Sequence, residues 1–290
     1  MLRRGLGVFV VLVLALGCAG KKEPVPPDKL WSEATQAYED EAYEYAVEQY
    51  KKLLDQHPFD PRAEEAELRI AQSHYLAGRY AEAIAAFGDF ERMHATSANL
   101  PEVEYYLGMS YLAQASTADR DQQVHSNAMT YFRNVIDRFP TSPWAERAQL
   151  RLRECREALA KHEAGVATYY LRRGNLRAAE ARLRGLLTEY PDTDATAEVL
   201  FTFARAYDAR DEVEGAALAR ATLVRHHPDD PLAREAREQL GKGGGSGLDG
   251  DDPLPLLVSR IDRMHDEGAR QKLPPNVSAY PEVGGVNAGY

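Results

Sequence analysis

The chain has 290 residues, of which 44% are hydrophobic, 28% charged and 9% aromatic. This balance is typical of a globular chain or a repeat array and excludes a collagen, a coiled-coil rod and a multi-span membrane protein. Lys and Arg number 35 against 45 Asp and Glu, a formal charge of −10, which argues against nucleic acid as a partner. The two cysteines, Cys18 and Cys155, are too few for a disulfide framework or a four-cysteine zinc site.

The N-terminal segment has the pattern of a secretory signal. Two arginines precede an unbroken apolar run at 8–16, which is too short to span roughly 30 Å of hydrocarbon. Small residues then precede Cys18, an arrangement that resembles the lipobox of bacterial lipoproteins, although Ala15 stands where that family usually has Leu. The resemblance implies a signal peptide at 1–17 and acylation of the Cys18 thiol, and more than one acyl chain gives stable anchoring. The alternative is ordinary secretion that leaves Cys18 as a free thiol.

Residues 18–29 are polar and proline-rich, so we predict a flexible tether. The residue after Cys18 is Ala19, not the Asp that retains well-understood lipoproteins in the inner membrane. The lipoprotein resemblance therefore implies the outer membrane.

The region 30–240 carries apolar residues at helical spacing with no sustained alternation of period two, which predicts an all-α chain. Self-comparison finds one pattern five times. Its central alanines are Ala46, Ala83, Ala128, Ala179 and Ala216. A proline follows twelve residues after four of them, at Pro58, Pro140, Pro191 and Pro228. Upstream of each alanine, a second predicted helix pairs a small residue with an aromatic one, as in Ala34 with Tyr38.

This pattern resembles tetratricopeptide (TPR) repeats. Small residues let paired helices approach, aromatic residues fill the gap, and proline ends the second helix. We therefore expect a right-handed TPR solenoid of about five helix-turn-helix repeats over 30–240, with a groove that binds peptides. Residues 143–173 hold no helix breaker except Gly165, so we expect one long helix there.

The C-terminal segment 241–290 is rich in glycine and proline, and we predict a flexible tail that contains a short helix at 254–267. Four apolar residues of that helix could dock on the repeats or on another protein. They are Leu256, Leu257, Ile261 and Met264.

The chain is more specifically similar to the BamD/ComL family, in stretches that a general TPR pattern does not demand. These stretches are 57–59 (HPF), 80–90 (YAEAIAAFGDF), 119–122 (DRDQ), 158–174 (ALAKHEAGVATYYLRRG) and 189–193 (EYPDT). The chain departs from the family at 95–101, where that family tends to have a Pro-Thr-His-Pro turn, and the resemblance does not extend beyond residue 240.

The family resemblance implies an outer-membrane lipoprotein on the periplasmic face, part of the β-barrel assembly machinery. Such a protein binds an Omp85-type barrel assembly subunit and other assembly lipoproteins, and helps receive unfolded outer-membrane proteins. The candidates for the substrate groove are Tyr43, Phe59 and Tyr80. The candidates for the partner interface are Tyr170, Tyr190, Asp192, Asp119 and Arg120. The alternative for the tyrosines is packing between helices, and for 119–122 a solvated loop.

No pattern predicts catalysis, a cofactor or a metal site. The eight histidines are scattered, without the His-Glu-x-x-His spacing of a zinc helix. The Gly245–Gly250 match to G-x-G-x-x-G lies in a glycine linker with no strand before it, and no G-x-S-x-G turn occurs. The alternative function is that of another periplasmic TPR lipoprotein, either a pilotin-like secretin or pilus assembly factor or an adaptor of the cell-wall machinery.

Overall fold

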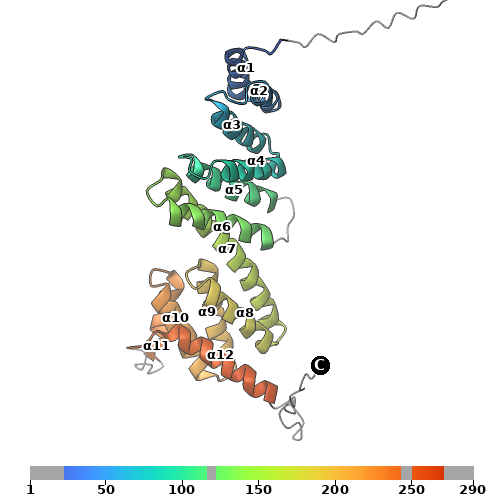
Figure 1. Cartoon of the computed structure of the whole chain (residues 1–290). Coiled ribbons are helices and arrows are strands. Elements are labelled where there is room, and N and C mark those ends of the chain that lie inside the picture. The colour runs from blue at the N-terminus through green and yellow to red at the C-terminus, as the bar shows by residue number, and fades with distance from the viewer. Residues whose placement is uncertain (1–22, 116–121, 243–249, 271–290) are drawn as a thin grey trace, which may run out of the picture. The chain divides into compact units, whose positions relative to one another are not determined.

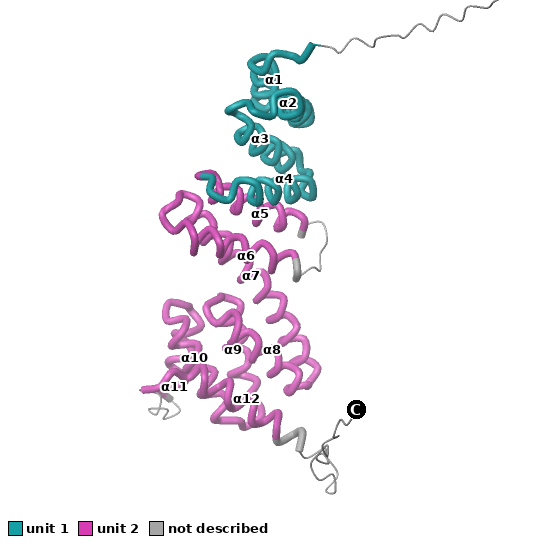
Figure 2. Tube along the Cα trace, viewed as in Figure 1, with its two compact units in different colours: residues 1–97 teal, residues 98–290 magenta. Residues whose placement is uncertain are grey.

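The computed structural model describes residues 23–115, 122–242 and 250–270, and within these ranges it contains twelve helices and no strand (Figure 1). The predicted signal peptide with Cys18, and the loop that holds Asp119 and Arg120, lie outside the described residues. The chain divides into two compact units, residues 1–97 and 98–290 (Figure 2). In the described ranges no helix has both the length and the apolar run needed to cross a bilayer.

The first unit consists of two helical hairpins. Its helices are α1 (Pro27–Glu39), α2 (Tyr43–Gln56), α3 (Ala63–Leu76) and α4 (Tyr80–Met93), and each packs on the next. The alanines of the repeat pattern lie between the helices and are fully buried, as Ala34, Ala46 and Ala83 show. A methyl group at these positions lets the helix backbones approach while Tyr50 and Phe87 fill the space beside them.

The second unit contains the other eight helices. They are α5 (Leu100–Ala115), α6 (Gln122–Arg138), α7 (Pro143–Arg172), α8 (Leu176–Glu189), α9 (Asp194–Asp208), α10 (Val213–His226), α11 (Pro231–Lys242) and α12 (Pro253–Arg270). Helix α7 has 30 residues and joins two apolar clusters. Its first half, with Ala148 and Cys155, packs with α5 and α6, and its second half, with Ala160 and Ala167, packs with α8 and α9.

The helical hairpins share one turn geometry. The residue two positions before the second helix has a positive φ in four of the hairpins: Glu41 (59°), Gly78 (73°), Gly174 (72°) and Asp211 (59°). In the α5–α6 hairpin, Gly108 of α5 lets the Phe132 ring of α6 pack against the α5 backbone. A Cβ added to Gly108 would lie 2.6 Å from Cε1 of Phe132. The predicted all-α repeat fold and the long helix near 143–173 are confirmed.

The first helix begins before the predicted end of the tether. Helix α1 begins at Pro27, where the fixed φ of proline suits the first turn. The preceding Val25 is held at the end of α2, since its N–H donates to Gln56 Oε1 at 2.8 Å and its carbonyl oxygen lies 2.7 Å from His57 Nε2. Residues 25–29, expected in a flexible tether, are thus part of the first unit.

The C-terminal segment also contains more helix than the sequence indicated. Helix α12 covers 18 residues and packs against α8 and α10. Of the four residues that could dock, Leu257 and Ile261 are fully buried, whereas Leu256 and Met264 are each 45% exposed. The buried stripe is completed instead by Leu254 and Val258, because the 3.6-residue period places residues 254, 257, 258 and 261 on one face.

Candidate functional site

The first unit places two of the substrate-groove candidates at equivalent positions. Tyr43 and Tyr80 are the first residues of α2 and α4, and each packs on a tyrosine of its own hairpin, Tyr38 and Tyr75, with ring centroids 5.9 and 5.8 Å apart. Both are half-buried. Arg79 Nη2 lies 2.8 Å from an oxygen of Glu44, so the two helix starts are neighbours. Each tyrosine therefore packs within its hairpin and also presents part of its ring at one end of the unit.

The third candidate, Phe59, is 97% exposed in the loop between α2 and α3. The loop is fixed by Arg62, whose backbone N–H and Nε donate to Asp60 Oδ1 at 2.9 and 2.8 Å and whose Nη2 donates to Oδ2 at 2.8 Å. These hydrogen bonds lower the pKa of Asp60 to about 2. Arg62 also pairs with Asp28 at 3.0 Å and lies 5.3 Å from the Trp31 ring centroid. The loop thus holds an apolar side chain in solvent.

The structure does not bring the three candidates into a single site. Tyr43 begins α2 and Phe59 follows its end, and this 14-residue helix is about 20 Å long. The tyrosines and Phe59 therefore lie at opposite ends of the α2 helix, and a single ligand would have to run along the helix to reach both.

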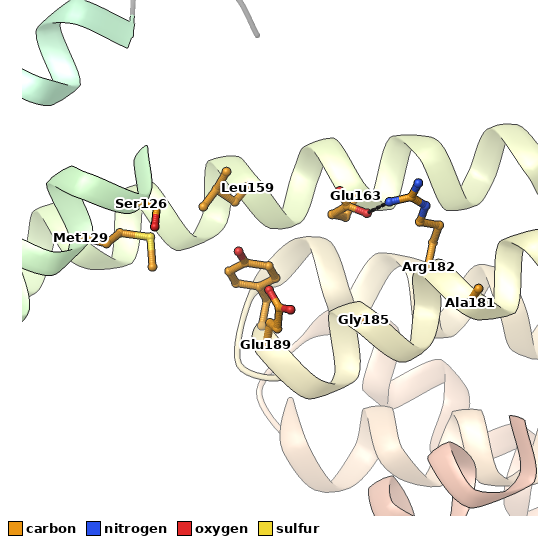
Figure 3. Close-up of a pocket in the computed structure, with 9 residues that line it drawn as sticks. Ser126, Met129, Leu159, Glu163, Ala181, Arg182, Gly185 and Glu189 are labelled. Atoms are coloured by element: carbon orange, nitrogen blue, oxygen red, sulfur yellow. Dashed lines mark hydrogen bonds and ion pairs between the residues drawn. The ribbon is translucent and has the colours of Figure 1, made fainter. Parts of the chain in front are cut away.

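In the second unit, a groove of about 470 Å³ lies between α6, α7 and α8 (Figure 3). It is lined by Ser126, Met129, Leu159, Glu163, Ala181, Arg182, Gly185, Glu189 and Tyr190. Arg182 Nη1 and Glu163 Oε2, 3.0 Å apart, join α8 to α7 along one side. Met129 and Leu159 supply apolar surface. The groove can accept an apolar side chain between charged rims.

Two consecutive residues of α7 hold the turn between α8 and α9 at the edge of this groove. Arg156 pairs with the Asp192 carboxylate, and its guanidinium carbon lies 5.5 Å from the Tyr190 ring centroid. The Glu157 carboxylate accepts hydrogen bonds from the backbone N–H groups of Asp194 and Ala195 at 2.9 and 3.1 Å, where α9 begins. This carboxylate satisfies donors that the helix itself leaves free.

Of the partner-interface candidates, the structure brings Tyr190 and Asp192 together and places Tyr170 elsewhere. Burial raises the pKa of the half-buried Tyr190, while Asp192 is exposed. Tyr170 is half-buried on α7 and lines a separate shallow hollow, beside Tyr169, whose ring is 5.6 Å away and which is 52% exposed. Sequence reasoning missed Arg156 and Glu157, because nothing in the pattern pairs a charge on α7 with a residue 36 or more positions later.

The described residues contain no candidate metal site, and the cysteine among them is buried. They contain no group of three or more His, Cys, Asp and Glu side chains placed to hold a metal ion. Cys155 is buried in the cluster between α5, α6 and α7, and burial raises the pKa of its thiol to about 12. At neutral pH this thiol is a small apolar side chain, not a nucleophile.

A family of proteins described as "Outer membrane lipoprotein" (YfiO) matches the chain over residues 23–223. The chain belongs to the YfiO family of outer membrane lipoproteins. Together with the named relatives described next, this match confirms the resemblance to the BamD/ComL family. The matched segment of this YfiO-family chain includes the Phe59 loop and the groove with Tyr190, but ends before α11 and α12.

Several relatives carry the name outer membrane protein assembly factor BamD. The protein of Vibrio cholerae is 30% identical over 215 residues, which cover 70% of this chain and 89% of the relative. The protein of Caulobacter vibrioides is 29% identical over 254 residues, covering 83% and 82%. That of Neisseria gonorrhoeae is 28% identical over 250 residues, covering 81% and 94%. Among solved structures, the TPR2AB-domain:pHSP90-complex of yeast Sti1 aligns with a TM-score of 0.42 at 16% identity, over 85% of this chain and 94% of that chain.

Proposed function

We propose that this chain is an outer-membrane protein assembly factor: a helical scaffold of the β-barrel assembly machinery that makes and breaks no covalent bonds. It couples an Omp85-type barrel-forming subunit to unfolded outer-membrane proteins. The match to the outer membrane lipoprotein family over 23–223, and relatives that bear the assembly-factor name over 82–94% of their own length, support this role.

The observation that carries the proposal is the turn held by Arg156 at the edge of the groove. Tyr190 offers a ring and a hydroxyl, Asp192 offers an exposed carboxylate, and both contact Arg156 of helix α7. Aromatic residues on a fixed backbone are typical anchors of protein interfaces, since little entropy is lost when they bind. We assign this turn and the adjoining groove to the barrel-forming subunit.

The first unit receives the substrate in this proposal. An unfolded barrel protein presents apolar side chains and unpaired backbone groups. The exposed Phe59 ring supplies apolar contact area, and Tyr43 and Tyr80 add hydroxyl groups that can bond to backbone. Because these residues lie at opposite ends of α2, the substrate contacts the unit as an extended segment.

The anchor in this proposal is a lipid on Cys18, which holds the chain at the periplasmic face of the outer membrane. The proline-rich residues after Cys18 separate the acyl chains from the first helix, which begins at Pro27.

An affinity purification from detergent-solubilised membranes tests the function. The lipidated protein is captured and the co-purifying proteins are identified by mass. We expect an Omp85-type barrel protein, and we expect Tyr190→Ala to reduce its recovery while Phe59→Ala, in the other unit, leaves it unchanged. Recovery of a secretin, a pilus component or a cell-wall enzyme without the barrel protein would contradict the proposal and favour the alternative adaptor role.

A further inference from the structure

Helix α12 covers a face formed by α8 and α10 (Figures 1 and 2). Helix α8 lies inside the segment 23–223 that matches the family, and α10 ends three residues after that segment. Helix α12 begins thirty residues after the end of the segment. The intervening segment includes 243–249, four of whose seven residues are glycine. Helix α12 thus lies outside the segment that matches the family and packs back on two helices that lie within it or at its end.

The apolar part of the contact is one stripe. Leu257 and Ile261 are fully buried, and Leu254 and Val258 pack against the same cluster. At spacing i, i+3, i+4 and i+7, these side chains form the narrow face by which an amphipathic helix lies in a groove.

A buried arginine stands within this stripe. The side chain of Arg260 is 7% exposed and pairs with Glu212, and its Nη1 lies 3.5 Å from Glu180 Oε1. Its guanidinium carbon lies 4.7 Å from the Tyr207 ring centroid. A Cβ on Gly215 would lie 2.8 Å from that carbon, so a larger residue there would force the guanidinium to move.

The slot that receives Arg260 is built by residues of α8, α9 and α10 and the residue before α10. Tyr207 Oη donates to Glu180 Oε1 at 2.8 Å, which fixes the carboxylate beside the hydroxyl of the ring. Glu180 is buried with a side-chain exposure of 5%, and Glu212 is partly buried. Carboxylates in such surroundings favour a cation. A guanidinium pairs with the carboxylates and also stacks on the aromatic ring. The face is therefore shaped for a helix that carries an arginine.

His265 of α12 also lies at the slot, with its Nε2 3.7 Å from Glu180 Oε2. Two other polar contacts of α12 are peripheral. Arg184 Nε lies 2.6 Å from Asp262 Oδ1, and His226 Nε2 lies 2.8 Å from Asp252 Oδ1. These side chains are between about a quarter and a half exposed. Exposed pairs contribute little and weaken as salt rises. The stripe and the slot are consequently what hold the helix.

We propose that the α8–α10 face is an exchangeable binding site for an amphipathic helix with an arginine six residues after the first residue of its apolar stripe, and that α12 is a tethered copy of this ligand. A helix of the same pattern in a second protein competes with α12 for the site. The inference does not rest on the proposed function, because it concerns only this face and its ligand.

The test uses the full chain with Arg260→Glu and a fluorescent peptide of residues 251–270. The substitution places a third carboxylate in the slot and releases α12. We expect the peptide to bind this variant at least tenfold more tightly than it binds the parent chain, as measured by anisotropy. A peptide that carries Arg260→Glu should bind at least tenfold more weakly. The matched control is Arg263→Glu in the chain, since Arg263 is 60% exposed and lies 3.8 Å from Glu214. Equal peptide binding by the Arg260→Glu variant and the parent would overturn the proposal.

A second measurement needs no substitution in the site. A protease recognition sequence placed at 243–249 is cleaved in the folded chain, and labelled peptide 251–270 is added in excess. We expect the peptide to replace the cleaved helix, and replacement to be faster at high salt. Retention of the original helix up to the denaturant concentration at which the second unit unfolds would show that α12 is a fixed part of the fold and would overturn the proposal.

Discussion

The guanidinium carbon of Arg156 lies 5.5 Å from the centroid of the Tyr190 ring. The same side chain pairs with Asp192, so one residue of α7 contacts both the half-buried ring and the exposed carboxylate of the α8–α9 turn. The turn is therefore tied to the 30-residue helix α7 by two contacts of one side chain. A rigid turn can present an aromatic ring and a carboxylate to a partner in one fixed arrangement.

Arg156→Ala should weaken recovery of the barrel-forming subunit several-fold, because Tyr190 and Asp192 lose the support that orients them. The loss of folding stability should stay below about 2 kcal/mol, since a cation–π contact contributes about 1 kcal/mol and an exposed ion pair no more. Recovery is measured by affinity purification and stability by urea unfolding. Arg153→Ala, on an exposed position of α7 one turn earlier, is the control. Equal recovery with both variants would show that the turn needs no support from Arg156.

Phe59→Ser should leave the free energy of unfolding within about 0.5 kcal/mol of the parent, because the ring is 97% exposed and buries no core surface. Binding of a denatured outer-membrane protein, followed by fluorescence anisotropy, should fall. Met93→Ser is the control, since Met93 is another exposed apolar side chain of the first unit, at 57%. If both substitutions lower binding equally, the affinity depends only on the exposed apolar area, and Phe59 is not a specific contact for the substrate.

The repeat register could be predicted because it follows from sterics that act within each hairpin. The alanines at 46, 83, 128, 179 and 216 are each at most 1% exposed, as close helix packing requires. The charge pairs could not be predicted in the same way. Arg156 with Asp192, and Arg260 with Glu180, join residues 36 and 80 positions apart, and their meeting depends on helix rotations that periodicity does not fix.

The exposure of the two tyrosines of α7 could not be predicted either, because it also depends on helix rotation. Tyr169 and Tyr170 differ by about 100° around the helix, so one is exposed while the other packs against the core cluster. The aromatic pattern identifies the pair, but the rotation of α7 against α8 and α9 decides which ring faces solvent.

Glu41→Gly should stabilise the first unit by about 0.5 kcal/mol. Glu41 has a φ of 59°, a left-handed conformation that strains a residue with a side chain by about 1–2 kcal/mol, and the extra chain entropy of glycine offsets part of the gain. Gly78→Ala, at the equivalent turn, should lose about 1 kcal/mol because its φ is 73°, although a Cβ there would touch nothing within 4 Å. Urea unfolding of both variants measures these changes. A loss of stability with Glu41→Gly would mean that the glutamate side chain contributes more than the strain it brings.

Alkaline pH should destabilise the second unit through Cys155. Burial raises the pKa of this thiol to about 12, whereas the thiol of an unfolded chain ionises near pH 8.5. The unfolded state therefore releases a proton that the folded state keeps. The stabilisation from the neutral thiol is fully present below about pH 8.5 and is lost as pH rises toward 12. The difference in unfolding free energy between the parent and Cys155→Ala should shrink by about 1.4 kcal/mol between pH 7 and 9.5. A difference that stays constant over this range would mean that the thiol ionises equally in both states.

Cys18→Ala should release the protein from membranes into the periplasmic fraction and abolish incorporation of labelled palmitate, because the acyl chains have no other attachment point in the proposed anchor. Circular dichroism should be unchanged, since Cys18 precedes the first helix, which begins at Pro27. Cys155→Ala is the matched control and should keep the lipid and the membrane fraction, because that thiol is buried. The experiment is carried out in cells depleted of the barrel-forming subunit, so that protein contacts cannot retain the chain. A Cys18→Ala protein that stays with the membranes of such cells would show that lipid is not the anchor.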